Sequence, residues 1–326
     1  MILILTQADD VHADAAEAEL GRRDARWLRF DPAQVPTRAS IAVHFSEGRV
    51  RRTLHHDGGQ VDLDEVSAVW FRRPGRPVPP AHLTGYLADF VAGESATFVG
   101  DAWETLDVLA VPAPRPVVQR AQYKLRQLQL AAQLGFELPE TVAGNHPDAV
   151  LDLFNAHGGH LISKQVGLNR LGGGLVRYTE PVRHRDLVHV EGIRQCPVIV
   201  QSYVPKRLEL RVTVVGEQVY AAAIDSQHAH HTRYDWRRYD DKNSRMRPWD
   251  LPEDVAARCV DLTRRLGLRY GAIDLVLTPD DRYVFLEINP SGQYLWVEDA
   301  TGLPITAAIV DLLMSATAAA TTGGNS

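Results

Sequence analysis

Two polar residues interrupt an apolar run near the end of the chain, and their spacing suits metal binding. Glu287 and Asn289 lie two positions apart in the sequence Val-Phe-Leu-Glu-Ile-Asn, directly before a Pro-Ser-Gly turn. Residues two apart on a strand project from the same face, so one carboxylate and one amide oxygen would point together. Hard divalent cations such as Mg²⁺ take oxygen ligands of this kind. We therefore predict that Glu287 and Asn289 bind a divalent cation.

A third oxygen ligand is predicted on the strand just upstream. Asp274 is the single charged residue in the apolar segment 271–277, and a turn at 279–281 joins that segment to the strand carrying Glu287. Two such strands form a hairpin, which would bring Asp274, Glu287 and Asn289 to one face. Acidic side chains in an apolar setting are costly to bury without a cation. The hairpin is therefore interpreted as a platform for metal and phosphate.

Two lysines are candidates for binding phosphate. Lys164 lies in the middle of the apolar strand predicted over 160–166, and Lys124 lies on the amphipathic helix predicted over 120–135. An unpaired ammonium in an apolar strand is costly, and a nucleotide phosphate would satisfy it. The alternatives are a structural ion pair for Lys164 and a solvated helix position for Lys124.

A second pair of charged residues shares one strand face. Glu209 and Arg211 are two apart at the start of the strand predicted over 209–215, so both side chains point the same way. A surface cross-strand salt bridge would explain them. In the functional interpretation, Glu209 binds a ribose hydroxyl and Arg211 binds an anionic substrate, because a guanidinium forks onto oxyanions.

Two polar loops could contribute further contacts. A glycine triplet could close over phosphates with its backbone amides or serve as a flexible connection; it comprises Gly172, Gly173 and Gly174. The loop 226–249 contains several arginines and a group of histidines, whose spacing fits no closed zinc site. Arg233 and Arg237 could hold a substrate carboxylate, or the loop could be a solvated basic segment.

Composition excludes several classes of protein. The chain has 326 residues and a net charge of −6, which argues against nucleic acid as the main partner. No apolar stretch reaches the about 18 residues that a membrane span needs. The two cysteines, Cys196 and Cys259, provide no disulfide framework, which fits a reducing cytoplasm. We therefore expect a cytoplasmic globular protein that neither crosses a membrane nor binds nucleic acid.

The elements that must position these residues fall into three segments. Strand and helix patterns alternate before the proline-rich stretch 111–116, which marks a domain boundary. We predict an N-terminal α/β domain over 1–112, a central domain over 113–200 and a C-terminal domain over 201–315. The Ala-, Thr- and Gly-rich segment 316–326 is expected to be a disordered tail.

Taken in order, these residues resemble the nucleotide and metal site of the ATP-grasp superfamily of carboxylate–amine ligases. The matching set lies within residues 115–313 and consists of Lys124, Lys164, the segment Gln201–Val204, Glu209, Arg211, Asp274, Glu287 and Asn289. The resemblance implies a three-lobed α/β ATP-grasp fold, with an N-terminal α/β domain, a central lid and a C-terminal metal-binding lobe. ATP would lie between the last two lobes.

The resemblance also implies a role for each residue. The nucleotide would be bound by the lysines, the glycine loop, the hinge and the ribose ligand, namely Lys124, Lys164, Gly172, Gly173, Gly174, Gln201, Tyr203, Val204 and Glu209. Asp274, Glu287 and Asn289 would hold Mg²⁺ ions that bridge the phosphates. Arg211 would stabilise the transferring phosphoryl group and an acyl phosphate.

Two further segments narrow the resemblance. Trp70-Phe-Arg-Arg and Asp235-Trp-Arg are similar to segments of the graspetide maturases, the microviridin-type peptide macrocyclases. The resemblance implies that ATP activates Asp or Glu side chains of a ribosomal precursor peptide, which then close to ω-ester or ω-amide rings. Arg233 or Arg237 would dock the substrate carboxylate, and the enzyme would be a homodimer. The general base stays open between Asp225 and the histidines at 228–231.

Two other functions are compatible with the same residues. One is a ligase that adds amino acids to a peptide or a small acid, as the similar ribosomal-protein glutamate ligases do. The other is a nucleotide- or peptide-binding module without catalysis. Product mass separates the first from a macrocyclase, and replacement of Glu287 separates the second from an enzyme.

Overall fold

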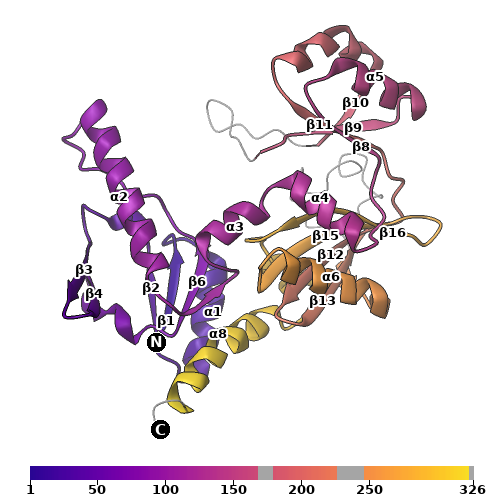
Figure 1. Ribbon diagram of the computed structural model, residues 1–326. Coiled ribbons are helices and arrows are strands. Elements are labelled where there is room, and N and C mark those ends of the chain that lie inside the picture. The colour runs from indigo at the N-terminus through magenta and orange to yellow at the C-terminus, as the bar shows by residue number, and fades with distance from the viewer. Residues whose placement is uncertain (168–178, 226–245, 323–326) are drawn as a thin grey trace.

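The computed structural model describes residues 1–167, 179–225 and 246–322, with side chains up to residue 316. Within these ranges the chain forms an N-terminal α/β domain, a small central lobe and a C-terminal lobe (Figure 1). This is the three-lobed α/β arrangement predicted from the sequence. In the described ranges, no helix combines the length and the apolar character that a membrane span requires.

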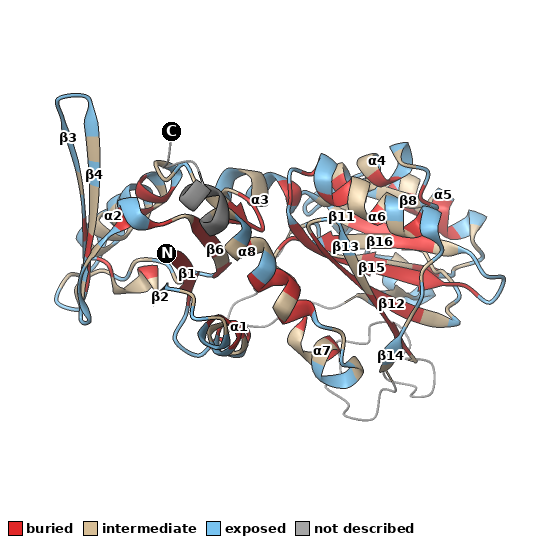
Figure 2. Ribbon diagram, turned by 90° about the horizontal axis from the view of Figure 1, so that it is seen from below, coloured by how far each residue is buried: buried red, intermediate tan, exposed pale blue. Residues whose placement is uncertain are grey.

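The N-terminal domain is built on a four-stranded parallel sheet in the order β2-β1-β6-β7. A separate antiparallel sheet, β3-β4-β5, projects from this domain (Figure 2). The elements are β1 Ile2–Thr6, α1 Val11–Arg22, β2 Trp27–Phe30, η1 Pro32–Gln34, β3 Ser40–Ser46, β4 Arg49–His56, β5 Gly59–Asp62, η2 Leu63–Glu65, β6 Ala68–Arg73, α2 Tyr86–Glu104 and β7 Leu109–Val111.

Alternate residues of β1 enter two hydrophobic clusters on opposite faces of the parallel sheet. Ile2 and Ile4 pack with α1 and with the C-terminal helix α8, whereas Leu3 and Leu5 pack with α2 and the β3–β4 hairpin. The last helix of the chain therefore completes the first domain, and both ends lie on the same side of the molecule (Figure 1). Helix α8 runs over Ile305–Thr322, so residues 316–322 are helical where a disordered tail was expected over 316–326, and residues 323–326 lie outside the described ranges. The alanine-rich composition that suggested disorder also favours helix.

Two helices lead from the first domain to the central lobe, where a single helix was predicted over 120–135. They are α3 (Arg115–Ala121) and α4 (Lys124–Gln133), and no glycine or proline marks the break between them. The central lobe holds an antiparallel sheet in the order β10-β9-β11-β8, covered by α5. Its elements are β8 Thr141–Gly144, α5 Pro147–Ala156, β9 Leu161–Lys164, β10 Glu180–Val182, η4 His184–Arg194 and β11 Val198–Ser202.

The C-terminal lobe is a five-stranded antiparallel sheet in the order β14-β13-β12-β15-β16. Helix α6 packs on one face together with α3 and α4, and Ile273, Leu275 and Phe285 fill the core between them. The elements are β12 Leu208–Val215, β13 Gln218–Ile224, β14 Met246–Pro248, α6 Glu253–Arg265, β15 Tyr270–Leu277, β16 Tyr283–Asn289 and α7 Leu295–Thr301.

A buried glutamine ties α4 to the edge strand β16. Gln127 is 3% exposed. Its Nε2 donates to the carbonyl of Ile288 at 2.8 Å and to that of Ala121 at 2.7 Å, and its Oε1 accepts from the Ile288 amide at 3.2 Å. An edge strand leaves backbone groups without a neighbouring strand. Gln127 satisfies those of Ile288, the residue between Glu287 and Asn289.

A buried histidine lies where the first domain meets the C-terminal lobe. His12 is 4% exposed at the start of α1, and its ring meets the ring of Tyr294 edge-on with centroids 4.8 Å apart. Burial lowers the pKa of His12 to about 4, and the charge of Arg72 acts in the same direction. His12 is therefore neutral in the folded protein at pH 7.

Replacing Gln127 by Leu should destabilise the protein by about 2–4 kcal/mol, because the amide and carbonyl of Ile288 lose their buried partner. Chemical denaturation measures this change. Gln129→Leu, at an exposed position of the same helix, is the matched control and should change stability by less than about 0.5 kcal/mol. Equal effects of the two substitutions would contradict the role assigned to Gln127.

The free energy of unfolding should fall as the pH is lowered from 6.5 to 4, because unfolded His12 binds a proton in that range and folded His12 does not. The contribution of His12 is on the order of 3 kcal/mol, fully present above pH 6.5. His12→Phe should flatten this part of the pH profile, and replacement of the exposed His44 by Phe should leave it unchanged. An unaltered profile in His12→Phe would contradict the assignment.

Candidate active site

Four charged side chains form a row across three strands and one helix. Arg211 on β12 lies directly opposite Asp274 on β15, and Asp274 lies directly opposite Glu287 on β16. The Arg211 Nη1 is 2.7 Å from the Asp274 Oδ1. At the other end, the Lys124 Nζ of α4 is 3.4 Å from the Glu287 Oε2. The row therefore reads cation, anion, anion, cation.

The row is shielded from solvent, which makes its charge balance important. The side chains of Arg211 and Asp274 are 5% and 11% exposed, and those of Lys124 and Glu287 are 21% and 17% exposed. Two adjacent carboxylates in such a setting disfavour each other's ionised form, and an opposite charge nearby offsets this. The hairpin thus brings Asp274 and Glu287 together as predicted, and each carboxylate contacts a cation.

A bulge in β16 is what turns Glu287 toward Asp274. From the turn up to the pair Leu275–Phe285 the two strands are in simple register, but the next pair is Asp274–Glu287 and leaves Leu286 as an extra residue. Without that extra residue Leu286 would face Asp274, and Glu287 would point into the core beneath the sheet. Leu286 and Glu287 instead both line the same cavity.

The turn after β16 is packed too closely for a side chain. Asn289 is exposed, and its Oδ1 accepts the amide of Ser291 at 3.3 Å. A Cβ on Gly292 would lie 2.4 Å from the Ala272 Cβ and 2.9 Å from the Arg211 Nη2. The glycine in the Pro-Ser-Gly turn is therefore required by close approach, and this approach lets Arg211 reach the turn.

A solvent-open cavity of about 570 Å³ lies between the central sheet and the C-terminal sheet. It brings together predicted ligands from separate parts of the sequence, together with apolar side chains. The lining residues are Pro139, Ile162, Lys164, Thr179, Ser202, Tyr203, Val204, Lys206, Glu209, Asp274, Val276, Leu286 and Glu287. An elongated polar ligand in this cavity could reach both central-lobe Lys164 and the charge row.

Lys206 is a cavity residue that sequence reasoning missed. Its Nζ is 3.0 Å from the Glu209 Oε1, and both side chains are less than 10% exposed. The sequence did contain a sign of this contact, since Lys206 lies three residues before Glu209 and just after the predicted nucleotide-binding segment Gln201–Val204. It was overlooked because lysines in loops are usually solvated.

The remaining predicted residues divide into three groups. Lys124 lies outside the cavity lining but contacts Glu287. Gln201 is 1% exposed and its Nε2 donates to the Thr141 Oγ1 at 2.9 Å, so its side chain is directed away from the cavity. The third group, which lies outside the described residues, comprises Gly172, Gly173, Gly174, Arg233, Arg237 and the histidines at 228–231.

The donor set of the row fits a hard cation together with an anion. In the described ranges no three His, Cys, Asp or Glu side chains cluster as a metal site. A cation at Asp274 and Glu287 therefore needs further oxygens, which the Asn289 amide and a phosphate can provide. The Arg211 Nε is buried and has no hydrogen-bond partner among the described residues.

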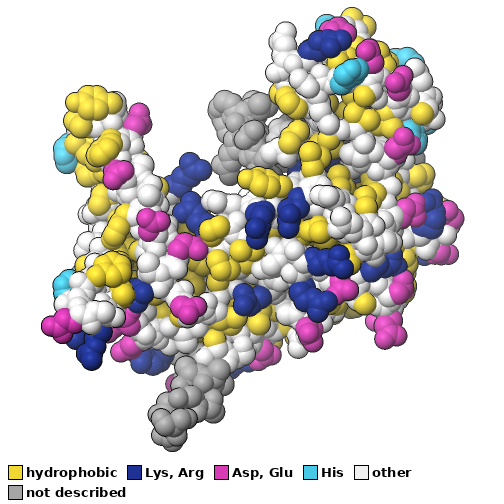
Figure 3. Space-filling view, in the orientation of Figure 1, with side chains coloured by type: hydrophobic (Ala, Val, Ile, Leu, Met, Phe, Trp, Pro, Cys, Tyr) yellow, Lys and Arg dark blue, Asp and Glu magenta, His cyan; other side chains and the backbone are white. Residues whose placement is uncertain are grey.

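Basic side chains also gather on the face of the molecule that carries α3 and α4, between helix α2 of the first domain and the central lobe (Figures 1 and 3). The overall charge of the chain is nevertheless −6. A locally positive face on an acidic protein raises the local concentration of anionic ligands.

Comparisons with known proteins agree with this geometry. Residues 1–113 match the MvdD pre-ATP grasp domain, and residues 121–313 match the RimK-like ATP-grasp domain. A curated relative from Klebsiella pneumoniae, named probable alpha-L-glutamate ligase, is 27% identical over 82% of this chain and 90% of its own length. A relative of the same name from Xanthomonas euvesicatoria is 29% identical over 62% of this chain and 68% of its own.

Solved structures resemble the whole chain. The macrocyclase MdnC of Microcystis aeruginosa, bound to its precursor peptide MdnA, superposes with a TM-score of 0.85 at 31% identity, covering 96% of this chain and 99% of that one. A RiPP-associated ATP-grasp ligase from Chryseobacterium gregarium, in complex with ADP and a leader and core peptide, gives 0.88 at 28% identity, covering 96% of each chain. With its three lobes, its charge row and these matches, the chain belongs to the RimK-like ATP-grasp family of ligases.

Proposed function

We propose that this ATP-grasp ligase is a peptide macrocyclase. It activates Asp or Glu side chains of a ribosomally made precursor peptide as acyl phosphates and closes them to ω-ester or ω-amide rings, releasing ADP and phosphate. The observation that carries the proposal is the shielded row of Lys124, Glu287, Asp274 and Arg211 beside a solvent-open cavity lined by residues of two lobes. Similarity over almost the whole chain to ligases crystallised with precursor peptides supports the substrate class.

In this proposal ATP occupies the cavity between the central and C-terminal sheets. Lys164 and Lys124 contact its phosphates, the segment Tyr203–Val204 contacts the base, and Glu209 holds a ribose hydroxyl, oriented by Lys206. Asp274, Glu287 and Asn289 hold Mg²⁺, which neutralises charge on the phosphates when bound. Lys124 and Arg211 already lie beside these carboxylates, so positive charge from the chain itself balances them.

The chemistry proceeds in two steps. In the first, a carboxylate oxygen of the peptide attacks the γ-phosphorus, the bond to the β–γ bridging oxygen breaks, and ADP leaves. In the second, a hydroxyl or amine of the same peptide attacks the acyl carbon, and phosphate leaves with its oxygen. Arg211, which pairs with Asp274, would stabilise the negative charge in both steps. Each ring removes one water from the peptide, and the proton goes to a base such as Asp225 at the end of β13.

A second candidate is favoured by the curated relatives, which are named probable alpha-L-glutamate ligases. In that reaction the same acyl phosphate is attacked by the amine of a free amino acid. The charge row would serve both reactions equally, because the row acts before the nucleophile is chosen. The difference therefore lies in the product rather than in the first step.

The test is to incubate the protein with the short Asp- or Glu-containing peptide encoded beside its gene, ATP and Mg²⁺, and to record the peptide mass. Macrocyclisation predicts a loss of about 18 Da per ring, whereas a gain of about 129 Da per event would identify glutamate addition and contradict the proposal. Glu287→Gln should slow the reaction by at least about 100-fold. Glu217→Gln, in the exposed turn between β12 and β13, is the matched control and should retain full activity.

A further inference from the structure

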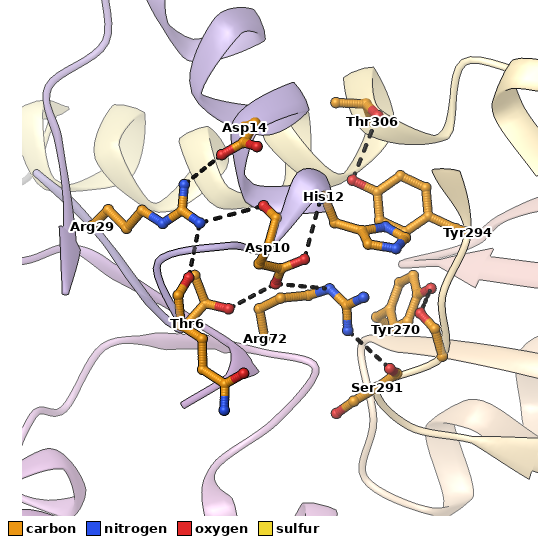
Figure 4. A network of polar contacts seen from close by, with 12 residues as sticks. Thr6, Asp10, His12, Asp14, Arg29, Arg72, Tyr270, Ser291, Tyr294 and Thr306 are labelled. Carbon is orange, nitrogen blue, oxygen red and sulfur yellow. Dashed lines mark hydrogen bonds and ion pairs between the residues drawn. The ribbon is translucent and has the colours of Figure 1, made fainter. Parts of the chain in front are cut away.

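The turn that follows Asn289 is held by donors from different parts of the molecule. The Tyr270 hydroxyl donates to the Gly292 carbonyl at 2.8 Å, and the Arg211 Nη2 donates to the Gln293 carbonyl at 3.1 Å. Burial raises the pKa of Tyr270 to about 12, so the hydroxyl keeps its proton. A further donor comes from the N-terminal domain: the Arg72 Nη1 donates to the Ser291 carbonyl at 3.0 Å (Figure 4).

Ser291 is therefore fixed on both sides of its backbone. Its carbonyl accepts from Arg72, and its amide donates to the Asn289 Oδ1 at 3.3 Å. An amide oxygen has two lone pairs, so the Asn289 Oδ1 can accept this hydrogen bond and still bind a cation. The orientation of the Ser291 backbone thus sets the direction in which that oxygen points.

Arg72 is itself held by an anion of the first domain. Its Nε lies 3.6 Å from the Asp10 Oδ2, and the two side chains are 3% and 5% exposed. Asp10 is fixed in turn, because the Thr6 Oγ1 donates to its Oδ2 at 2.6 Å and the His12 amide donates to its Oδ1 at 3.2 Å (Figure 4). A continuous set of contacts therefore runs from β1 through Asp10 and Arg72 to the turn.

Burying the ion pair of Asp10 and Arg72 costs desolvation free energy. Burial lowers the pKa of Arg72, and its Nε and Nη2 have no hydrogen-bond partner among the described residues. A buried ion pair is often no more stabilising than apolar side chains of similar volume. Stability alone therefore gives little reason for an arginine at this position, whereas the contact with Ser291 gives a specific one.

We propose that Arg72, held by Asp10, is a positioning residue that orients the Asn289 amide oxygen for Mg²⁺. The inference rests on the proposed function, in which Asn289 is a metal ligand. It assigns the N-terminal domain a part in a site whose other residues come from the central and C-terminal lobes. Arg72 does not touch nucleotide, metal or substrate in this account; it acts through Ser291.

The test measures metal binding without any peptide. In the presence of ADP, the increase of the melting temperature is recorded against Mg²⁺ concentration, and Mn²⁺ binding is followed by electron paramagnetic resonance. Arg72→Met should raise the midpoint for both ions about tenfold, the cost of one misoriented ligand. The effect of ADP alone should stay within about twofold. Arg72→Lys, which cannot reach Asp10 and Ser291 together, should fall between wild type and Arg72→Met.

Arg29→Met is the matched control. Arg29 belongs to the same network, with its Nη2 2.8 Å from the Gln7 carbonyl and 3.4 Å from the Asp10 carbonyl, but none of these contacts is with the turn (Figure 4). Its metal midpoint should equal that of the wild type. A wild-type midpoint in Arg72→Met, or an equal shift in Arg29→Met, would overturn the inference.

A second variant tests the inference if Arg72→Met does not fold. Asp10→Asn keeps the size of the side chain and removes the anion that holds Arg72, and it should raise the Mg²⁺ midpoint in the same direction; an unchanged midpoint would overturn the inference. The proposed function fails separately. If ADP binding to the wild type shows no dependence on Mg²⁺, both the proposed function and this inference fall, whereas Mg²⁺ dependence that is the same in all variants removes only the role of Arg72.

Discussion

Two carboxylates that lie side by side on neighbouring strands and are shielded from water require positive charge close to them. Asp274 and Glu287 are opposite each other, and neighbouring carboxylates of this kind are accommodated at lower cost where positive charge lies nearby. This positive charge comes from two sides, because Arg211 lies on strand β12 beside Asp274 and Lys124 lies on helix α4 beside Glu287. In the proposed function, the same arrangement would receive a divalent cation and a triphosphate, because the charges are already paired and oriented.

Each lobe contributes residues to the charge row or to its surroundings. The C-terminal sheet carries the row, and α4 lies beside the edge strand through Gln127, which also places Lys124 at Glu287. The central sheet supplies Lys164 and Tyr203 to the opposite wall of the cavity. The first domain reaches the turn after Asn289 through Arg72. Each lobe therefore contributes to one site, which is the arrangement that suits a reaction catalysed mainly by positioning and charge.

The residue types and their order could be predicted from the sequence, because carboxylates and lysines in apolar strands stand out from their neighbours. The β16 bulge could not be predicted. It depends on one extra residue, Leu286, and simple alternation would have turned Glu287 into the core. The roles of Gln127 and Lys206 were also missed, since a single polar residue on a helix or loop looks like a surface position until tertiary contacts are known.

Contacts between distant segments were likewise beyond the sequence. Nothing in local patterning shows that α8 returns to cover the first sheet, or that Arg72 meets the turn at Ser291. Such pairings are decided by packing of the whole chain rather than by propensity. Residues 316–322 are helical where disorder was expected, because an Ala-rich segment is compatible with both states.

We propose that the charge row activates a peptide carboxylate by phosphorylation, and following the oxygen atoms of that carboxylate tests this proposal directly. The precursor peptide is prepared with ¹⁸O in its Asp and Glu carboxylates and converted with ATP, and the released phosphate is analysed by mass spectrometry. An acyl phosphate intermediate predicts one ¹⁸O atom in phosphate for each ring formed and none in ADP. The carboxylate oxygen that attacks phosphorus stays bound to phosphorus when phosphate leaves. Unlabelled phosphate alongside completed rings, or ¹⁸O appearing in AMP, would contradict the proposal.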